Sequence, residues 1–315
     1  MEIVSVRPAV QTRAKKKGIN RRLVISSLQA YLFLLPTFAL VGLFSYYPAL
    51  LALYHSMTDW NGILLADYVG LNNFREMLRD QVLLASLGNM VTVAIWSLVV
   101  TLTVPLLVAE LIYALRNNRA QYWYRLLFVA PIVVPFVVTL LVWRFIYDPD
   151  LGLLNALLER LGISFHSRWL GDPKLALYCL LFIGFPFAAG TNVLIYLAGL
   201  QSIGESVIDA AKLDGATGLR RMISIDLPLI MGQVRLLGIL SLIGGIQGFG
   251  AQLVLTRGGP GYATMVPGMW MYETAFSYSR MGYASAIGTS MFIVILGLTL
   301  VIMRSVESST DYTAR

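Results

Sequence analysis

The chain has few of the residues from which catalytic and metal sites are built. Of its 315 residues, one is cysteine, two are histidine and 13% are charged. Cys179 has no partner for an internal disulfide, and its apolar surroundings favour a role in helix packing. His55 and His166 lack neighbouring carboxylates or cysteines at metal-ligand spacing. The sequence therefore predicts no catalytic residue and no bound metal.

Motifs for nucleotide binding and hydrolysis are also absent from the sequence. There is no Gly-x4-Gly-Lys-Ser/Thr phosphate loop and no Gly-x-Ser-x-Gly nucleophile elbow. We therefore expect a protein that is not an enzyme and holds no cofactor of its own. Any ATP and Mg²⁺ that drive it would be bound by another chain.

Apolar residues are abundant: they make up 57% of the chain, and the mean hydropathy is +0.70. This composition excludes an ordinary soluble domain. Runs of about 20 apolar residues can cross roughly 30 Å of hydrocarbon as helices. The sequence predicts an all-α integral membrane protein with six transmembrane helices within residues 29–303, between a basic tail at 1–28 and a second tail at 304–315. The expected spans are 29–54, 85–114, 123–147, 175–200, 229–255 and 283–303.

The distribution of lysine and arginine predicts the orientation in the membrane. With a cytoplasmic N-terminus, fifteen of these residues fall in the cytoplasmic tails and connections, against seven on the outer side. Both termini are therefore expected in the cytoplasm. The net charge of +7 is mostly this bias, so the lipid bilayer is an expected partner and nucleic acid is not.

Three ionisable residues fall within the predicted spans, namely Glu110, Arg144 and Arg235. Each lies within about two helical turns of a span end, where a long side chain can reach the interface or form a salt bridge between helices. This placement weakens the main alternative function, a stand-alone secondary transporter or channel. A non-transporting membrane scaffold is a further alternative.

A polar segment at 201–228, here called the island, separates two apolar runs. The Ser-x-x-Glu spacing of Ser202 and Glu205 predicts a capping box that starts a helix, and Gly215 is placed to end it. A second short helix through Leu219 to Met222 would then run to Pro228. This knob is either a docking element for a partner or an amphipathic hairpin lying on lipid headgroups. Its four acids, Glu205, Asp209, Asp214 and Asp226, count against an anionic membrane surface.

The spacing within the island resembles the cytoplasmic signature of permease subunits of bacterial ATP-binding-cassette (ABC) importers. That signature reads Glu-Ala-Ala, three residues, Gly, nine residues, Ile-x-Leu-Pro. The matching residues are Asp209, Ala210, Ala211, Gly215, Ile225, Leu227 and Pro228, with Asp in place of Glu at the first position. Asp214-Gly215-Ala216 also matches the extended form of the carbohydrate-uptake branch. The family often has Pro where Gly204 stands and Glu where Ser206 stands.

Five further fragments are similar to the same branch and occur in order along the chain. They are Gly70-Leu71-x-Asn73-Phe74, Asp148-Pro149-x2-Gly152-x2-Asn155, Ala198-Gly199-Leu200-Gln201-x-Ile203, Thr256-x-Gly258-Gly259-Pro260-x3-Thr264 and Gly282-Tyr283-Ala284-Ser285-Ala286. The resemblance covers about residues 30–303. The chain lacks the extra helices and the outer domain of the maltose-type large subunit and resembles a plainer six-span half.

The resemblance implies the architecture of a type I ABC importer permease in the bacterial plasma (inner) membrane. It further implies an ATP-driven, binding-protein-dependent importer of a carbohydrate, with an oligosaccharide favoured. The expected partners are a second, non-identical permease subunit, a dimer of cytoplasmic ATPase subunits that bind ATP and Mg²⁺, and an extracytoplasmic solute-binding protein. The residues expected to couple to the ATPase are Glu205, Asp209, Ala210, Ala211, Asp214, Gly215, Ala216, Arg220, Arg221, Ile225, Leu227 and Pro228.

Polar and aromatic residues within the spans are candidates for a substrate pathway, since sugars are held by ring stacking and hydroxyl hydrogen bonds. These candidates are Asn192, Tyr196, Gln247 and Phe249, with ordinary helix packing as the alternative. The turn at Gly258, Gly259 and Pro260 is expected to face outward and to contact the binding protein or the mouth of the pathway. Trp143, Tyr147, Trp270 and Tyr272 are expected in the interfacial aromatic belt.

Overall fold

The computed structural model describes residues 21–63, 66–186 and 190–305. This part of the chain is helical, apart from a two-stranded antiparallel sheet in which β1 (Thr58–Asp59) pairs with β2 (Asp67–Tyr68). Most of the predicted tails at 1–28 and 304–315 lies outside the described residues. The chain divides into two units, one ending at Leu51 and one beginning at Ala52.

The first unit begins with α1 (Arg21–Val41), which passes through a π-helical turn, η1 (Gly42–Tyr46), into α2 (Tyr47–His55). The stretch Tyr31–His55 is long and apolar enough to cross a membrane. Its large side chains are exposed, Phe33 by 86%, and none of the 18-residue window is buried within the chain. Such a surface is costly in water and suits contact with lipid.

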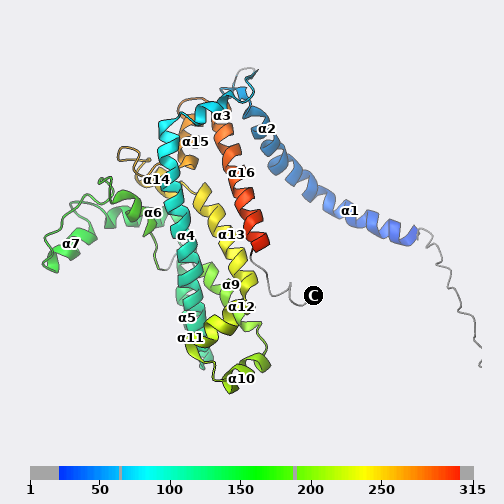
Figure 1. Ribbon diagram of the computed structural model, residues 1–315, viewed down its shortest axis with the longest axis vertical. Helices are drawn as coiled ribbons and strands as arrows, with labels where there is room; N and C mark the ends of the chain where they lie inside the picture. The colour runs from blue at the N-terminus through cyan, green and yellow to red at the C-terminus, as the bar shows by residue number, and fades with distance from the viewer. Residues whose placement is uncertain (1–20, 64–65, 187–189, 306–315) are drawn as a thin grey trace, which may run out of the picture. The chain divides into compact units, whose positions relative to one another are not determined.

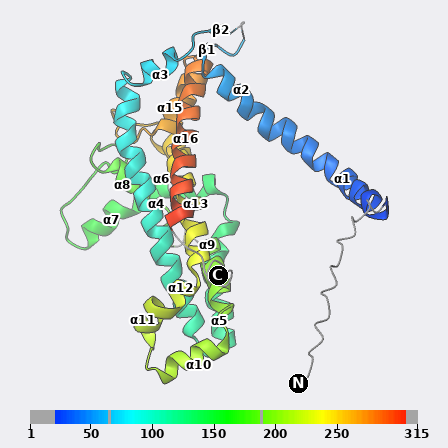
Figure 2. The same cartoon turned by 45° about the vertical axis from the view of Figure 1, so that its right-hand side comes forward.

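The second unit is a bundle of long and short helices. Helix α4 packs against α9 and α13, and α16 packs against α13 and α15 (Figure 1). Both views place α10 and α11 at the end of this bundle opposite α3 and α15 (Figure 2). The elements are α3 (Asn72–Met77), α4 (Gln81–Ala114), α5 (Asn118–Val129), η2 (Ala130–Val133), α6 (Phe136–Ile146), α7 (Leu153–Arg160), α8 (Ala176–Leu181), α9 (Gly190–Gln201), α10 (Glu205–Leu213), α11 (Gly218–Arg221), η4 (Met222–Asp226), α12 (Leu227–Leu229), α13 (Met231–Gln247), α14 (Gly250–Leu255), α15 (Pro267–Phe276) and α16 (Met281–Ser305).

Four helical stretches in the described residues are each long and apolar enough to cross a membrane: Tyr31–His55, Gln81–Ala114, Met231–Leu255 and Met281–Ser305. Two bent pairs bring the number to six if each pair is one span. Asn118–Val133 meets Phe136–Ile146 at 91°, and Gly190–Gln201 meets Glu205–Leu213 at 76°. The protein is thus a multi-pass membrane protein with four to six spans.

Two of the expected spans are not the continuous helices that the sequence predicted. The run 123–147 is broken between Val133 and Phe136, and the run 175–200 is interrupted after α8. Pro135 lies at the first break, where its missing backbone N–H prevents the helix from continuing, and Gly184, with φ +75°, lies in the turn that follows α8. Hydropathy alone does not register such breaks, because proline leaves the apolar run intact.

The largest apolar cluster joins α4, α9 and α13. Its buried members include Leu106, Ile112, Val193, Tyr196 and Leu237. Helices α4 and α13 approach closely at Gly245, where a Cβ would lie 2.8 Å from the Cα of Ala94. Small residues at such crossings allow the helix backbones to pack directly against each other. This packing holds α4, α9 and α13 together beside the island.

Candidate functional site

The island forms a two-helix knob, as the sequence predicted. Helix α10 ends at Leu213, and Gly215 adopts φ +70°, a left-handed conformation that suits glycine. The N–H of Gly215 donates to the Lys212 carbonyl at 3.1 Å, and that of Ala216 to the Ala211 carbonyl at 2.8 Å. The predicted glycine-terminated helix is confirmed.

The start of the knob differs from the prediction. The Ser202 hydroxyl donates back to the Gly199 carbonyl at 2.6 Å and so belongs to the end of α9. Helix α10 begins at Glu205 with Gly204 as its N-cap and no capping side chain, so the predicted capping box is wrong. The second helix is also not regular up to Pro228. It passes from α11 through the π-helical turn η4 into α12, where Pro228 lies in the first turn.

Gly204 occupies a conformation that proline also adopts, with φ −62° and ψ 140°. We predict that Gly204→Pro raises the free energy of unfolding by about 0.4–1 kcal/mol, because proline restricts the unfolded chain. Denaturation of the detergent-solubilised protein measures this. Gly215→Pro is the matched control, and it should lower stability because proline cannot reach φ +70°. Equal effects of the two changes would contradict the assignment of Gly204.

The knob presents apolar side chains to its surroundings. Leu213 is 89% exposed, Leu219 68% and Ile223 60%. An exposed ion pair of 2.8 Å joins Asp209 and Lys212 on the same helix. Apolar side chains displayed on a polar, charged knob are typical of a surface that a partner covers.

The residues predicted to couple to an ATPase divide by burial. Ala211 and Ala216 are buried, so they pack inward and do not admit a partner. Another three are partly buried: Arg221, Ile225 and Leu227. The remaining seven are exposed and available to a partner: Glu205, Asp209, Ala210, Asp214, Gly215, Arg220 and Pro228.

Arg221 points into the bundle and takes part in a cluster that we call the charge triad, Glu110, Arg221 and Asp226. Its Nε donates to Asp226 Oδ2 at 2.8 Å, and its terminal nitrogen lies 3.8 Å from Glu110 Oε2. Its guanidinium carbon lies 5.6 Å from the centre of the Tyr113 ring. The salt bridge considered for Glu110 is therefore confirmed, and Arg221 is its partner.

An open cavity of about 330 Å³ lies beside α4, and one predicted pathway residue, Asn192, lines it. The indole of Trp96 and the hydroxyls of Ser97, Thr101 and Thr191 share this lining. Trp96 donates through Nε1 to the Leu181 carbonyl at 2.9 Å, which holds the ring in place. An aromatic face beside hydroxyl and amide groups can bind a sugar ring. Within its apolar run, Trp96 carried no signal of this role.

The other three predicted pathway residues lie elsewhere. Tyr196 is fully buried in the apolar cluster of α4, α9 and α13, which is the packing alternative. Gln247 is exposed at the end of α13. Phe249 packs beside the buried Met269, and its ring centre lies 5.8 Å from that of Tyr272. The structure thus does not bring the four residues together.

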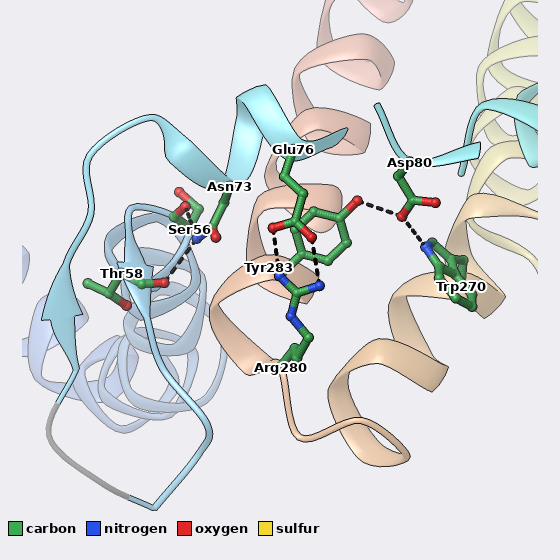
Figure 3. Close-up of polar contacts among 8 residues, drawn as sticks. All are labelled: Ser56, Thr58, Asn73, Glu76, Asp80, Trp270, Arg280 and Tyr283. Carbon is green, nitrogen blue, oxygen red and sulfur yellow. Dashed lines mark hydrogen bonds and ion pairs between the residues drawn. The ribbon is translucent and has the colours of Figure 1, made fainter. Parts of the chain in front are cut away.

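At the end of the bundle opposite the knob, one carboxylate joins three helices (Figure 3). Asp80 caps α4 by accepting from the N–H groups of Val82 and Leu83. Its Oδ2 accepts from Trp270 Nε1 and from the Tyr283 hydroxyl, both at 2.7 Å. Burial raises the pKa of the Asp80 carboxyl, but these hydrogen bonds lower it more, so its pKa lies below the ordinary value of 3.8.

Two of the aromatic residues expected in the interfacial belt have specific partners instead. The Tyr147 side chain is buried, and its hydroxyl donates to the Cys179 carbonyl at 3.0 Å. Trp270 is held by Asp80. The N–H of an indole and the O–H of a phenol usually form a hydrogen bond when they are buried. Hydropathy does not show which residue accepts that bond.

A second polar contact in Figure 3 joins Glu76 and Arg280, whose guanidinium binds both carboxylate oxygens at 2.7 and 2.6 Å. Hydrogen bonding to Glu76 raises the pKa of Arg280, so the guanidinium stays charged. The pair links α3 to the turn that precedes α16. The sequence alone does not indicate this contact, because residues more than 200 positions apart show no pairing signal in one sequence.

Several of the motifs that carried the family resemblance are structural. Asn73 donates to the carbonyls of Ser56 and Thr58 at 3.0 and 2.9 Å (Figure 3). Gly282 lies so close to the Thr58 carbonyl that a Cβ there would collide with it. In the third connection Asn155 donates to the Pro149 carbonyl at 2.9 Å. These residues hold the connections between helices.

The turn at Gly258, Gly259 and Pro260, predicted to face outward, is held by hydrogen bonds within its own segment. The buried Thr264 donates to the Gly259 carbonyl at 2.8 Å, and its hydroxyl lies 2.7 Å from that of Thr256. Gly258 has φ +78°, where other residues would be strained. The turn is therefore preorganised, and its contact with a binding protein stays a prediction.

Comparison with known proteins places the chain in a family. Residues 102–312 match the family described as "Binding-protein-dependent transport system inner membrane component". A probable ABC transporter permease protein of Pyrococcus horikoshii is 31% identical over 85% of this chain and 92% of its own length. The diacetylchitobiose uptake system permease protein NgcF of Streptomyces coelicolor is 32% identical over 95% and 87%. The sn-glycerol-3-phosphate transport system permease protein UgpA of Yersinia pseudotuberculosis is 32% identical over 90% and 95%.

The fold has a counterpart among solved structures. A chain of a bacterial ABC transporter involved in the import of the acidic polysaccharide alginate superposes with a TM-score of 0.78 at 20% identity, covering 91% of this chain and 99% of that one. The family match covers more than half of the residues, and the relatives match over most of their length. The chain therefore belongs to the family of inner membrane components of binding-protein-dependent transport systems.

Proposed function

We propose that the chain is a permease subunit of an ATP-driven, binding-protein-dependent importer and forms half of a translocation pathway. In this proposal the bent pair Asn118–Val133 and Phe136–Ile146 makes one span, and α8 with α9 makes another, which gives six spans with cytoplasmic termini. The knob of α10 and α11 is then cytoplasmic and docks on an ATPase subunit. The observation that carries this proposal is the apolar surface of the knob, with Leu213 89% exposed on a short, glycine-hinged loop.

The assembly that we propose contains four kinds of partner besides the bilayer. They are a second, non-identical permease subunit, a dimer of cytoplasmic ATPase subunits that hold ATP and Mg²⁺, an extracytoplasmic solute-binding protein and the transported solute. The family description names a binding-protein-dependent system. A structure of the alginate transporter in complex with a pentasaccharide-bound periplasmic protein, similar to this chain with a TM-score of 0.79, offers a precedent for such a partner.

The substrate that we propose is a carbohydrate, and the cavity favours a neutral one. NgcF is named for diacetylchitobiose uptake, and the relative MsmF of Streptococcus mutans is named as a multiple sugar-binding transport system permease. Among the described residues that line the cavity beside α4, none is charged. Trp96 offers a face for ring stacking, and Ser97 and Asn192 offer hydrogen bonds to hydroxyls. A phosphorylated sugar would find no lysine or arginine there to balance its charge.

Isolation of the assembled complex tests the proposal. The tagged chain would be purified in mild detergent from its native host, and its stoichiometric partners identified by mass spectrometry. We expect an ATPase subunit with the wild type and its loss from an Asp209→Lys, Gly215→Pro double variant. That variant reverses an exposed charge on α10 and breaks the turn that positions it. Asp150→Lys, on an exposed connection far along the chain from the knob, is the control and should retain the partner.

The alternative function, a stand-alone secondary transporter or channel, predicts the opposite result. Such a protein would purify without an ATPase subunit, and the double variant would not change its partners. Uptake driven by an ion gradient would then be the next assay.

A further inference from the structure

The charge triad places two carboxyl groups, those of Glu110 and Asp226, against the single guanidinium of Arg221. Arg221 and Asp226 form a 2.8 Å pair, and Asp226 is completely buried. Glu110 brings a second carboxylate from α4, 3.8 Å from the same guanidinium, with its side chain only 11% exposed. Among the described residues, neither Glu110 Oε1 nor Asp226 Oδ1 has a hydrogen-bond partner. A buried carboxylate without full compensation costs stability, so the presence of Glu110 does not follow from folding.

The contacts of Arg221 join the knob to α4. Arg221 ends α11 and is therefore part of the knob, whereas Glu110 and Tyr113 lie in the last turns of α4. The guanidinium faces both α4 residues, at 3.8 Å from Glu110 Oε2 and 5.6 Å from the Tyr113 ring centre. A displacement of α11 thus acts on α4 through the electrostatic attraction between these groups.

Helix α4 connects this contact to the cavity. It runs without interruption from Gln81 to Ala114 and contributes Trp96, Ser97 and Thr101 to the cavity lining. At a rise of 1.5 Å per residue, Trp96 and Glu110 are separated by roughly 21 Å along the helix axis. Pro105 lies between these two residues and removes one backbone hydrogen bond, but α4 continues through it, so a displacement at Glu110 acts on the same helix that lines the cavity.

We propose that Glu110 is a positioning residue through which movement of the knob reaches α4 and the cavity wall. The proposal rests on the proposed function, because it requires an ATPase subunit that moves the knob. In this proposal Arg221 connects the knob to α4. Asp226 keeps the guanidinium of Arg221 oriented, and the attraction between Arg221 and Glu110 moves α4 when the knob moves. The 3.8 Å separation leaves room for the Arg221 to Glu110 contact to shorten as the knob moves.

The change Glu110→Gln separates this role from a structural one. Glutamine has nearly the same shape and leaves Arg221 and Asp226 as a balanced pair, so the variant should fold and should retain the ATPase subunit. We expect only the transmission to fail. The ATP-dependent change at the cavity should shrink by about tenfold, the upper part of the range for residues that modulate coupling between sites.

Cysteine labelling measures that change without knowledge of the substrate. Cys179 is the single cysteine in the chain, so Cys179→Ser supplies a background in which Ser97→Cys reports on the cavity wall of α4. The complete importer with its native partners would be reconstituted in liposomes. The rate of labelling by a membrane-impermeant maleimide would be compared with and without ATP and vanadate.

The expected result is a nucleotide-dependent labelling rate with Glu110, a nearly constant rate with Glu110→Gln, and an intermediate response with Glu110→Asp. Glu159→Gln, an exposed acid on α7, should behave as the wild type. A full response from Glu110→Gln, or loss of the ATPase subunit from that variant, would overturn the proposal. If the wild type carries no ATPase subunit, the proposed function fails first, and the positioning role fails with it.

Discussion

Replacing Arg221 by glutamine is expected to lower the free energy of unfolding by about 3 kcal/mol, at the lower end of the range for removing one member of a buried ion pair. The change leaves two carboxylates facing each other, one of them completely buried. Asp226 would lose the 2.8 Å bond to Arg221 Nε. The attraction that holds the end of α11 against α4 would become repulsion between Glu110 and Asp226.

Denaturation of the detergent-solubilised chain measures this loss, with Arg220→Gln as the control on an exposed neighbour. The Arg221→Gln, Asp226→Asn double variant should be less destabilised than the sum of the single changes, because residues in one ion-pair network are not additive. Glu110→Gln alone should cost little or increase stability. If Arg221→Gln and Arg220→Gln have the same effect, the triad does not contribute to folding.

The second large effect is expected at the other end of the bundle. Asp80→Ala should lower the free energy of unfolding by about 3 kcal/mol, since it removes an N-cap and leaves the Trp270 and Tyr283 donors without their acceptor. Asp80→Asn retains an acceptor oxygen and should cost less. A loss no larger than that of Asp150→Ala, an exposed acid in a connection, would contradict the role assigned to Asp80.

The same carboxylate predicts a dependence on pH. Because the pKa of Asp80 in the folded chain lies below its ordinary value of 3.8, its stabilisation is present above pH 3.8. It is lost as the pH falls through the lowered value, when the proton displaces the hydrogen bonds from Tyr283 and Trp270. Unfolding measured over a series of acidic pH values should therefore show a weaker acid dependence for Asp80→Asn than for the wild type. Identical pH profiles would contradict this assignment.

The sequence predicted the features that depend on local composition and spacing. Four of the expected spans are present as long apolar helices, and the turn at Gly215 has the left-handed conformation that only glycine adopts without strain. The Asp-Ala-Ala, Gly and Ile-x-Leu-Pro spacing led to the family that the comparisons then established. The predicted capping box at Ser202 is wrong because the Ser202 hydroxyl donates to the Gly199 carbonyl in the preceding helical turn.

Contacts between distant residues were beyond the sequence. Arg221 was predicted to dock on the ATPase because it is a charged residue in a polar loop. The sequence does not show the direction in which its side chain points. Its guanidinium points inward to Asp226 and to Glu110, which lies 111 positions earlier. Tyr196 and Asn192 were equivalent as polar groups in one span, yet the packing of α9 against α4 buries the first and leaves the second at a cavity.

The sequence by itself determined that this chain is a helical membrane protein. It also determined that a polar island with a glycine turn interrupts the apolar runs, at a spacing that resembles a known family. Both features depend on hydropathy and turn chemistry, which act over a few neighbouring residues. The tertiary structure alone decided which charges are paired, where the spans bend and which side chains line a cavity. Those properties arise when helices far apart in sequence pack together. A buried polar group without a hydrogen-bond partner costs free energy, so the packed arrangement is one in which most such groups are paired.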